Sequence, residues 1–195
     1  MVNEDLTEEL LAELPSAKTL WNAWRDASRL NLPPKESDLR PKLDEIFESN
    51  IAIMEIHAPD RLIGRKMAAV AVKVMGIDFA GQNYVDLTPR HHRQPRMEFF
   101  WRVTTRPCGA LGKLPHVVPT NKRSYLMANV LALPVVQDHS CSVPLVYMSN
   151  DYEKHLHTSI FASHNSSEFP PTLQADWIDL GFGVEPVDLP AMQEC

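Results

Sequence analysis

Gly64, Arg65 and Lys66 stand directly before an apolar run that is predicted to be a helix, and they could bind an anion there. Backbone amides at a helix N-terminus attract phosphate or carboxylate groups, and two cations would add to that attraction. The complete phosphate-loop pattern GxxxxGK(S/T) is absent, and so is GxGxxG. We therefore interpret the stretch as a solvated turn and keep an anion site as the alternative.

The eight histidines form no metal-binding pattern. His91 and His92 are adjacent, so on a helix their side chains would point about 100° apart. His155 and His157 would share a face only in a strand. The motif HExxH is absent, and no histidine stands with a cysteine or an aspartate at ligand spacing. We expect solvated histidines and no metal.

The chain also lacks a motif for nucleophilic catalysis. No GxSxG elbow is present. Cys108 follows a proline at the end of a predicted helix, where the negative helix terminus disfavours a thiolate. We therefore expect a protein that is not an enzyme.

The composition is that of an ordinary folded protein. Its 195 residues suit one domain with additional terminal elements, and 44% of them are hydrophobic. Three cysteines without CxxC spacing argue against a disulfide framework or a zinc site and favour a reducing, cytoplasmic setting. The N-terminus lacks the features of a signal peptide. The longest apolar run, residues 67–75, contains Lys73 and is shorter than the ~20 residues that span a bilayer.

Charge is distributed unevenly along the chain, whose net charge is -6. Residues 1–14 and 155–195 contain five and six acids, respectively, and no base. Residues 90–123 contain eight basic residues and one acid, Glu98. The net negative charge argues against nucleic-acid binding, and we interpret the basic segment as a charged outer helix face. Nucleic-acid or nucleotide binding and attraction to the acidic ends are the alternatives.

Two tryptophans lie close together in a helix predicted from Ser16 onward. Leu20, Trp21 and Trp24 form a narrow apolar stripe on that helix. Such large side chains need a surface to pack on. That surface is either the sheet of the same chain or a partner helix in a homodimer, for which these three residues are the interface candidates.

Strands and helices alternate in groups after this segment. Branched side chains predict one hairpin over residues 51–56 and 61–63, and another over residues 125–136 and 143–148. Strands grouped at both ends of a helical middle favour an α+β fold with an antiparallel sheet and helices on one of its faces.

The predicted helices lie between the two hairpins. The spacing of apolar residues favours a helix over residues 67–74, and the Thr-Pro pair at 88–89 begins a longer one. Pro95 is expected to kink or restart that helix. Pro115 and Pro119 predict a loop with one short edge strand.

This order of elements resembles a PAS domain, and in particular the single-domain PAS family common in alphaproteobacteria, often called PAS_5. The similar pieces are TLWNAWR (19–25), SDLRPKL (37–43), RLIG (61–64), GIDFAG (76–81), RP (106–107), ALPVV (132–136) and WIDLGFGV (177–184). No piece is specific alone, and their order carries the resemblance. Ala80 departs from the family pattern, which has a hydroxyl residue there.

The resemblance implies a five-stranded antiparallel sheet flanked by helices, with a cavity between them. It divides the chain into an N-terminal helical extension (1–48), a PAS core (49–150) and a C-terminal tail (151–195). It also implies a role in bacterial signal transduction and dimerisation through the N-terminal helices. The chain shows no fused output domain, so a partner protein would have to receive any signal.

The implied cavity would bind a small apolar or amphipathic ligand. Its candidate lining residues are Ile63, Met67, Phe79, Tyr84, Phe100, Trp101, Thr104, Tyr125, Met127, Leu145 and Tyr147. Flavin photosensors of this type carry a cysteine motif resembling NCRFLQ, which is absent, and only His91 or His92 could be a haem ligand. We expect neither flavin nor haem. The alternative function is a ligand-free protein-interaction module with a filled core.

Overall fold

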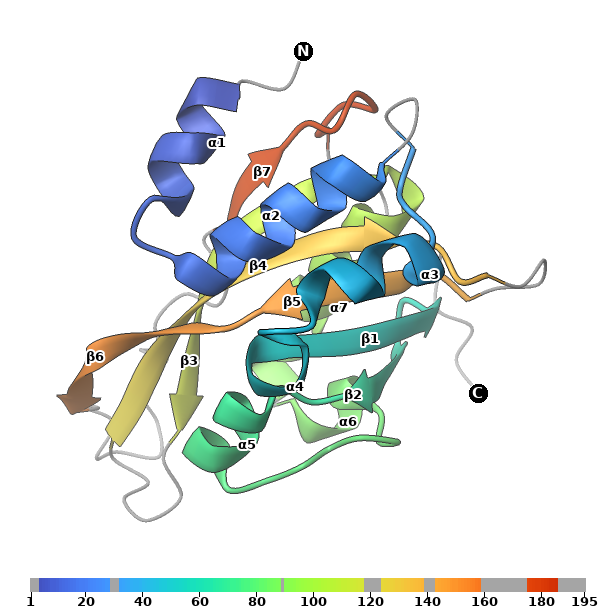
Figure 1. Ribbon diagram of the computed structural model, residues 1–195. Coiled ribbons are helices and arrows are strands. Elements are labelled where there is room, and N and C mark those ends of the chain that lie inside the picture. Colours follow the sequence, from blue (N-terminus) through green and yellow to red (C-terminus); the bar gives the residue numbers. More distant parts are fainter. Residues whose placement is uncertain are drawn as a thin grey trace.

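One antiparallel sheet of seven strands organises the protein (Figure 1). The computed structural model describes residues 4–28, 32–88, 90–117, 124–138, 143–158 and 175–185. The strands follow the order β2-β1-β5-β4-β3-β7, and β6 pairs with the first half of β4. Their bounds are β1 Ile51–Ala58, β2 Arg61–Lys66, β3 Gly109–Val117, β4 Ser124–Val135, β5 Leu145–Ser149, β6 Asp151–Thr158 and β7 Ala175–Ile178. The α+β class predicted from the sequence is confirmed, with β6 and β7 added to the expected sheet.

Helices cover both faces of this sheet. The first group is α1 (Glu4–Leu11), α2 (Pro15–Ala27), α3 (Glu36–Leu39), the 3-10 helix η1 (Arg40–Leu43) and α4 (Phe47–Asn50). The second group is α5 (Ala69–Met75), α6 (Tyr84–Leu87) and α7 (Arg90–Thr105). Figure 1 shows α2 and α3 in front of the strands and α7 behind them. The expectation of helices on one face is therefore wrong, because the N-terminal segment supplies a second layer.

The two faces carry different side chains because alternate residues of a strand point in opposite directions. The face under α2, called the α2 face below, carries Ile51, Ile53, Leu111, Leu131, Leu133, Val135, Leu145 and Tyr147. The face under α7, called the α7 face, carries Ala52, Met54, Ala110, Ala128, Val130, Ala132, Val146 and Met148. The α7 face thus has four alanines and two methionines where the α2 face has mostly larger, branched residues.

The strand pairs predicted from the sequence are present. β1 pairs with β2, with Glu55 opposite Ile63, and β4 pairs with β5, with Leu133 opposite Tyr147. The predicted helix after the first pair is α5. It ends at Gly76, whose φ of 67° is the left-handed conformation expected just beyond a helix end.

The segment around Pro115, predicted as a loop with one short edge strand, forms the longer strand β3, which lies between β4 and β7. β7 pairs only with the first half of β3, so Pro115 stands on an edge without a partner strand in the described ranges. A missing N–H costs little on such an edge, and the proline does not break the strand. Pro95 likewise lies inside α7 without ending it. Pro119 lies outside the described residues.

The tryptophan stripe packs on the chain's own sheet. Leu20, Trp21 and Trp24 are at most 4% exposed. Trp24 Nε1 donates a hydrogen bond of 2.8 Å to the carbonyl oxygen of Pro134 on β4. The assignment of these three residues to a dimer interface is therefore corrected, because their side chains are already covered within one chain.

A carboxylate from the sheet fixes the start of α2. Asp151, the first residue of β6, accepts hydrogen bonds from the backbone N–H groups of Ser16, at 3.0 Å, and Ala17, at 2.8 Å. Its negative charge also complements the positive end of the helix dipole. α2 is thus attached to the sheet at its first turn and, through Trp24, near its last turn.

Candidate functional site

A small cavity lies between the α7 face and the helices α5, α6 and α7. Its volume is about 40 Å³. The lining residues come from both layers: Ala52, Met54, Met67, Met75, Phe79, Tyr84, Phe100, Leu114, His116, Val130, Met148 and Asn150. We call this the inner cavity.

Four of the candidates named from the sequence line the inner cavity: Met67, Phe79, Tyr84 and Phe100. The candidates that lie elsewhere are Ile63, Trp101, Thr104, Met127, Leu145 and Tyr147. Leu145 and Tyr147 point to the α2 face, since their neighbours Val146 and Met148 occupy the α7 face. An error of one residue in a strand moves a side chain to the other face of the sheet. The side chain of Tyr125 lies outside the described part of the structure.

The strands supply most of the lining residues that sequence reasoning missed: Ala52, Met54, Leu114, His116, Val130 and Met148. The others are Met75 in α5 and Asn150 between β5 and β6. Leu114 and His116 are two residues apart in β3 and therefore share a face. An alternating pattern over residues 110–116 would have pointed to both. The predicted loop around Pro115 hid that pattern.

Gly64 in β2 holds the connector between α5 and α6 against the sheet. The N–H of Gly81 donates to the carbonyl oxygen of Gly64 at 2.6 Å, and the N–H of Gly64 donates to Gln82 at 3.1 Å. A Cβ atom at position 64 would lie 2.9 Å from the carbonyl oxygen of Phe79. Only glycine permits this close approach, which sets the Phe79 ring into the wall of the inner cavity.

The two cations after Gly64 are engaged within the chain. Lys66 Nζ donates to the carbonyl oxygens of Phe47, at 2.6 Å, and Ile51, at 3.0 Å, and burial lowers the pKa of its amine. Arg65 forms an ion pair of 3.0 Å with Glu36 in α3. The anion-site alternative is therefore wrong, because the stretch is a strand whose cations fasten the N-terminal helices to the first hairpin.

Aromatic rings form the helix side of the inner cavity. The rings of Phe79 and Tyr84 stack with their centroids 5.2 Å apart, and Phe100 meets Tyr84 edge-on at 6.1 Å. The Arg96 guanidinium lies 4.8 Å from the centre of the Tyr84 ring and donates to Thr88 Oγ1 at 3.1 Å. These contacts tie α6 to α7 along this wall of the cavity.

A buried polar pair lies at the sheet side. His116 Nδ1 and the Tyr152 hydroxyl share a hydrogen bond of 2.5 Å. Burial, with a smaller contribution from Arg96, lowers the pKa of His116 to about 4. Burial also raises the pKa of Tyr152. Both groups are neutral at pH 7, so a ligand in the inner cavity would meet mostly apolar walls with the uncharged side chains of His116 and Asn150 among them.

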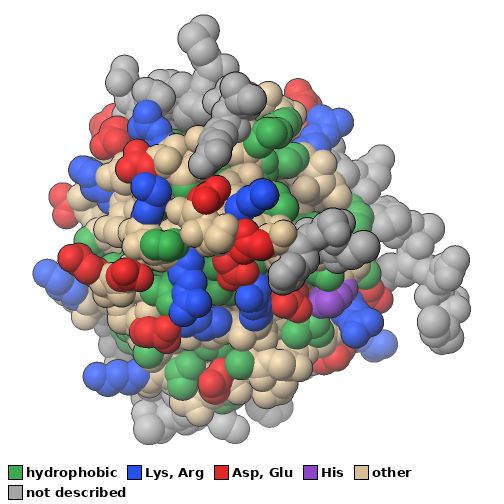
Figure 2. All heavy atoms as spheres, turned by 45° about the vertical axis from the view of Figure 1, so that its right-hand side comes forward, with side chains coloured by type: hydrophobic (Ala, Val, Ile, Leu, Met, Phe, Trp, Pro, Cys, Tyr) green, Lys and Arg blue, Asp and Glu red, His purple; other side chains and the backbone are tan. Residues whose placement is uncertain are grey.

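The basic segment makes contacts with the C-terminal stretch. The Arg102 guanidinium lies 3.8 Å from the centre of the Trp177 ring, and Arg106 forms an ion pair of 2.8 Å with Glu185. On the face shown in Figure 2, basic and acidic side chains are interspersed. These contacts favour the alternative in which the basic segment is attracted to the acidic end of the chain. Its residues 118–123 lie outside the described ranges.

The remaining candidates for chemistry are structural where they are described. Burial raises the pKa of the Cys108 thiol to about 11, so the thiol stays protonated at pH 7. Within the described ranges, no group of three His, Cys, Asp or Glu residues could hold a metal ion. In the same part of the chain, no helix is long and apolar enough to cross a membrane. Cys141, Cys195 and the side chain of His91 lie outside it.

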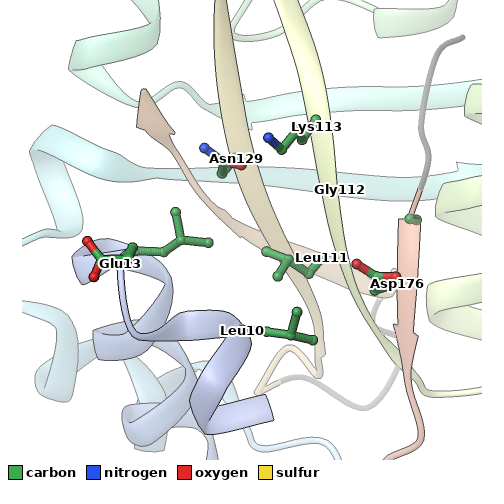
Figure 3. A pocket seen from close by; sticks show the side chains of 9 residues that line it. Leu10, Glu13, Leu111, Gly112, Lys113, Asn129 and Asp176 are labelled. Carbon is green, nitrogen blue, oxygen red and sulfur yellow. The ribbon is translucent and has the colours of Figure 1, made fainter. Parts of the chain in front are cut away.

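A second, larger hollow lies on the α2 face, at the β3 and β7 end of the sheet. It measures about 590 Å³. Its lining residues are Leu10, Glu13, Leu14, Leu111, Gly112, Lys113, Asn129, Ala175 and Asp176. Figure 3 shows Leu10 of α1 and Glu13 of the turn after it on one side of the hollow and the strand residues across from them. We call this the outer groove.

The protein thus has two hollows on opposite faces of one sheet, a small apolar cavity and a larger groove with charged side chains at its rim. No protein-family model matches the chain, and no curated protein or solved structure matches it. Inferences about function therefore rest on the geometry of the two hollows and on the sequence pieces that resemble PAS domains.

Proposed function

We propose that this protein is a PAS-type sensory or regulatory domain that binds a small apolar or amphipathic ligand in the inner cavity. The sequence pieces that resemble the PAS family support this, as does an antiparallel sheet flanked by helices. The observation that carries the proposal is the lining of the inner cavity: aromatic rings, methionines and one neutral polar pair. Mostly apolar walls with few polar groups are typical of small-molecule sites.

Methionines make the inner cavity adaptable. Met54, Met67, Met75 and Met148 line it, and such unbranched side chains change conformation readily. Pockets for drug-sized ligands measure about 300–1,000 Å³, far more than the 40 Å³ found here. A ligand of more than a few atoms therefore binds only when the methionines move. A partner protein that distinguishes the two arrangements would receive the signal.

The small volume favours a second candidate function, a protein-interaction module with a filled core and no ligand. In that case a surface contact with another protein or a second copy carries the function. Both candidate functions include a homodimer and a partner protein. The tryptophan stripe is not proposed as the dimer interface. Native mass spectrometry of the gently purified protein addresses both questions. A bound small mass supports sensing, and a monomer at high concentration contradicts the homodimer.

Benzene, which enters apolar cavities, separates the two candidate functions. Protein with ¹³C-labelled methionine methyls is titrated with benzene and followed by NMR. The sensor proposal predicts shift changes at the four lining methionines and none at Met127, which lies elsewhere. Ala52→Leu should fill the cavity and abolish the changes, whereas the control Met127→Leu should keep them. Wild-type protein without shift changes at saturating benzene would overturn the sensor proposal in favour of the filled core.

A further inference from the structure

We propose that the outer groove binds a small organic cation with an apolar body, such as an arylalkylammonium ion. The outer groove shares no lining residue with the inner cavity and lies on the other face of the sheet. Its volume of about 590 Å³ falls within the range of about 300–1,000 Å³ that is usual for small-molecule sites. The proposal is therefore independent of the proposed sensor function.

The fold builds the outer groove from distant parts of the chain. α1 and the turn after it lie against the end of the sheet that β3 and β7 form, and Figure 1 shows α1 beside β7. α1 belongs to residues 1–14 and β7 to residues 155–195, the two segments that contain acids and no base. Two described acids, Glu13 in the turn after α1 and Asp176 in β7, line the groove, and their carboxylates attract cations.

The centre of the outer groove is apolar. Leu10, Leu14, Leu111 and Ala175 contribute to its lining. Leu10 is 36% exposed, so part of its side chain meets water in the groove. In Figure 3 the side chains of Leu10 and Leu111 lie close together at the middle of the groove. An apolar body placed there would remove this leucine surface from water.

The charges at the rim favour a cation over an anion. The lining base, Lys113, is already compensated by Glu153 on β6 through an ion pair of 2.9 Å. The carboxylates of Glu13 and Asp176 have no hydrogen bond or ion pair within the described ranges. In Figure 3 the Asp176 carboxylate lies beside Leu111, and Glu13 lies on the opposite side of the groove.

Asn129 adds a neutral acceptor to this rim. Its Nδ2 donates to the carbonyl oxygen of Asp151 at 3.4 Å, which leaves the amide oxygen available. An ammonium group has three donors and no acceptor, so it matches a rim made of oxygen acceptors. A carboxylate ligand would meet Asp176 and Glu13 and a lysine that is already paired. We therefore expect Asp176 to be the main partner of the cation and Glu13 to add a weaker, longer-range attraction.

Three probes with the same apolar body test this proposal: 2-phenylethylammonium, 2-phenylethanol and phenylacetate. The full chain with ¹³C-labelled leucine methyls is titrated with each probe and followed by NMR. We expect shift changes at Leu10, Leu14 and Leu111, with the cation binding at least about tenfold more tightly than phenylacetate. Added salt should weaken the binding of the cation, because exposed charges are screened. Equal affinity for the three probes, or no change at these leucines, would overturn the proposal.

Matched variants locate the charge that the cation recognises. Asp176→Asn should remove most of the difference in affinity between 2-phenylethylammonium and 2-phenylethanol, and Glu13→Gln should remove a smaller part of it. Glu9→Gln is the control, since this exposed acid lies on α1 without lining the groove. If Glu9→Gln lowers the affinity for 2-phenylethylammonium as much as Asp176→Asn does, the attraction is a general property of the acidic surface. The assigned site is then wrong. The methionine methyls of the inner cavity should not respond to the cation, which separates this test from that of the sensor proposal.

Discussion

The two faces of the sheet are filled in different ways. On the α2 face, Trp21 and Trp24 pack on large branched side chains, and hydrogen bonds from Trp24 and to Asp151 fix the covering helix. On the α7 face, the alternate positions of the same strands carry alanines and methionines, and a cavity remains beneath the helices. A single sheet can thus combine a rigid side with an adaptable one. We infer that the part of the α2 face beneath Trp21 and Trp24 mainly provides stability and that the α7 face provides the adaptable cavity of the proposed sensor.

The largest loss of stability should follow a truncation on the α2 face. Trp24→Ala should lower the free energy of unfolding by about 3–5 kcal/mol, because it opens a cavity in a densely filled layer. It also leaves the carbonyl group of Pro134 without its partner. Urea unfolding followed by circular dichroism measures the loss. Trp24→Phe is the matched control and should lose less, since most of the ring volume remains. A loss below about 1 kcal/mol for Trp24→Ala would contradict a rigid α2 face.

The α7 face should be the more acid-sensitive one because of His116. The pKa of this histidine is lowered to about 4 in the folded protein, whereas it is about 6.5 in an unfolded chain. Between these values the unfolded state binds a proton that the folded state does not bind. Stability should therefore fall as the pH falls through this window, and His116 should contribute no pH dependence above it.

His116→Gln isolates this contribution. Between pH 7 and pH 4, the free energy of unfolding of the variant should fall by about 2–3 kcal/mol less than that of the wild type, because glutamine takes up no proton. Urea unfolding of both proteins at several pH values provides the comparison. Burial raises the pKa of the neighbouring Tyr152 hydroxyl, so this group stays neutral over the same range. Equal pH dependence in the two proteins would show that His116 is not held neutral by burial.

The attachment of α2 to the sheet should have a smaller effect. Asp151→Ala removes the acceptor of two backbone N–H groups. It should lower the free energy of unfolding by about 1–2 kcal/mol, as the loss of a helix cap does. Asp151→Asn keeps one oxygen acceptor and should cost less. Hydrogen exchange at Ser16 and Ala17 locates the change. Unchanged exchange rates in Asp151→Ala would mean that the carboxylate does not hold the helix.

The smallest effect is expected at the surface of the α7 layer. Arg106 and Glu185 form an ion pair although both side chains are largely exposed, and such pairs contribute about 0–1 kcal/mol. Arg106→Ala should therefore change the free energy of unfolding by less than about 0.5 kcal/mol. Arg106→Lys is the control that keeps the charge. A loss above about 1 kcal/mol would mean that the C-terminal stretch is a firm part of the α7 layer.

Local patterns in the sequence predicted much of the fold. Branched residues in β1, β2, β4 and β5, and the Gly76 end of α5, carry their signals within a few positions. The surface on which a helix packs has no such local signal. The stripe of Trp21 and Trp24 therefore left both the chain's own sheet and a dimer partner open as packing surfaces, and helices on the second face were missed.

The candidate site was harder to predict than the fold. Phe79, Tyr84 and Phe100 were found because their segments resemble PAS pieces and carry large aromatic rings. His116 was missed because Pro115 masks a strand that depends on long-range pairing with β4. The error at Tyr147 shows a further limit. Knowing that a segment is a strand does not establish which of its two sets of alternate residues faces a given layer.

A crystal structure under xenon pressure tests most directly whether the inner cavity on the α7 face is adaptable and accepts an apolar ligand. Xenon occupies dry apolar cavities, and its electron density is unmistakable. The account predicts a xenon atom between Met54, Phe100 and Met148, with displaced methionine side chains and an unchanged α2 face. An inner cavity without xenon, or xenon bound beneath Trp21 and Trp24 instead, would contradict it.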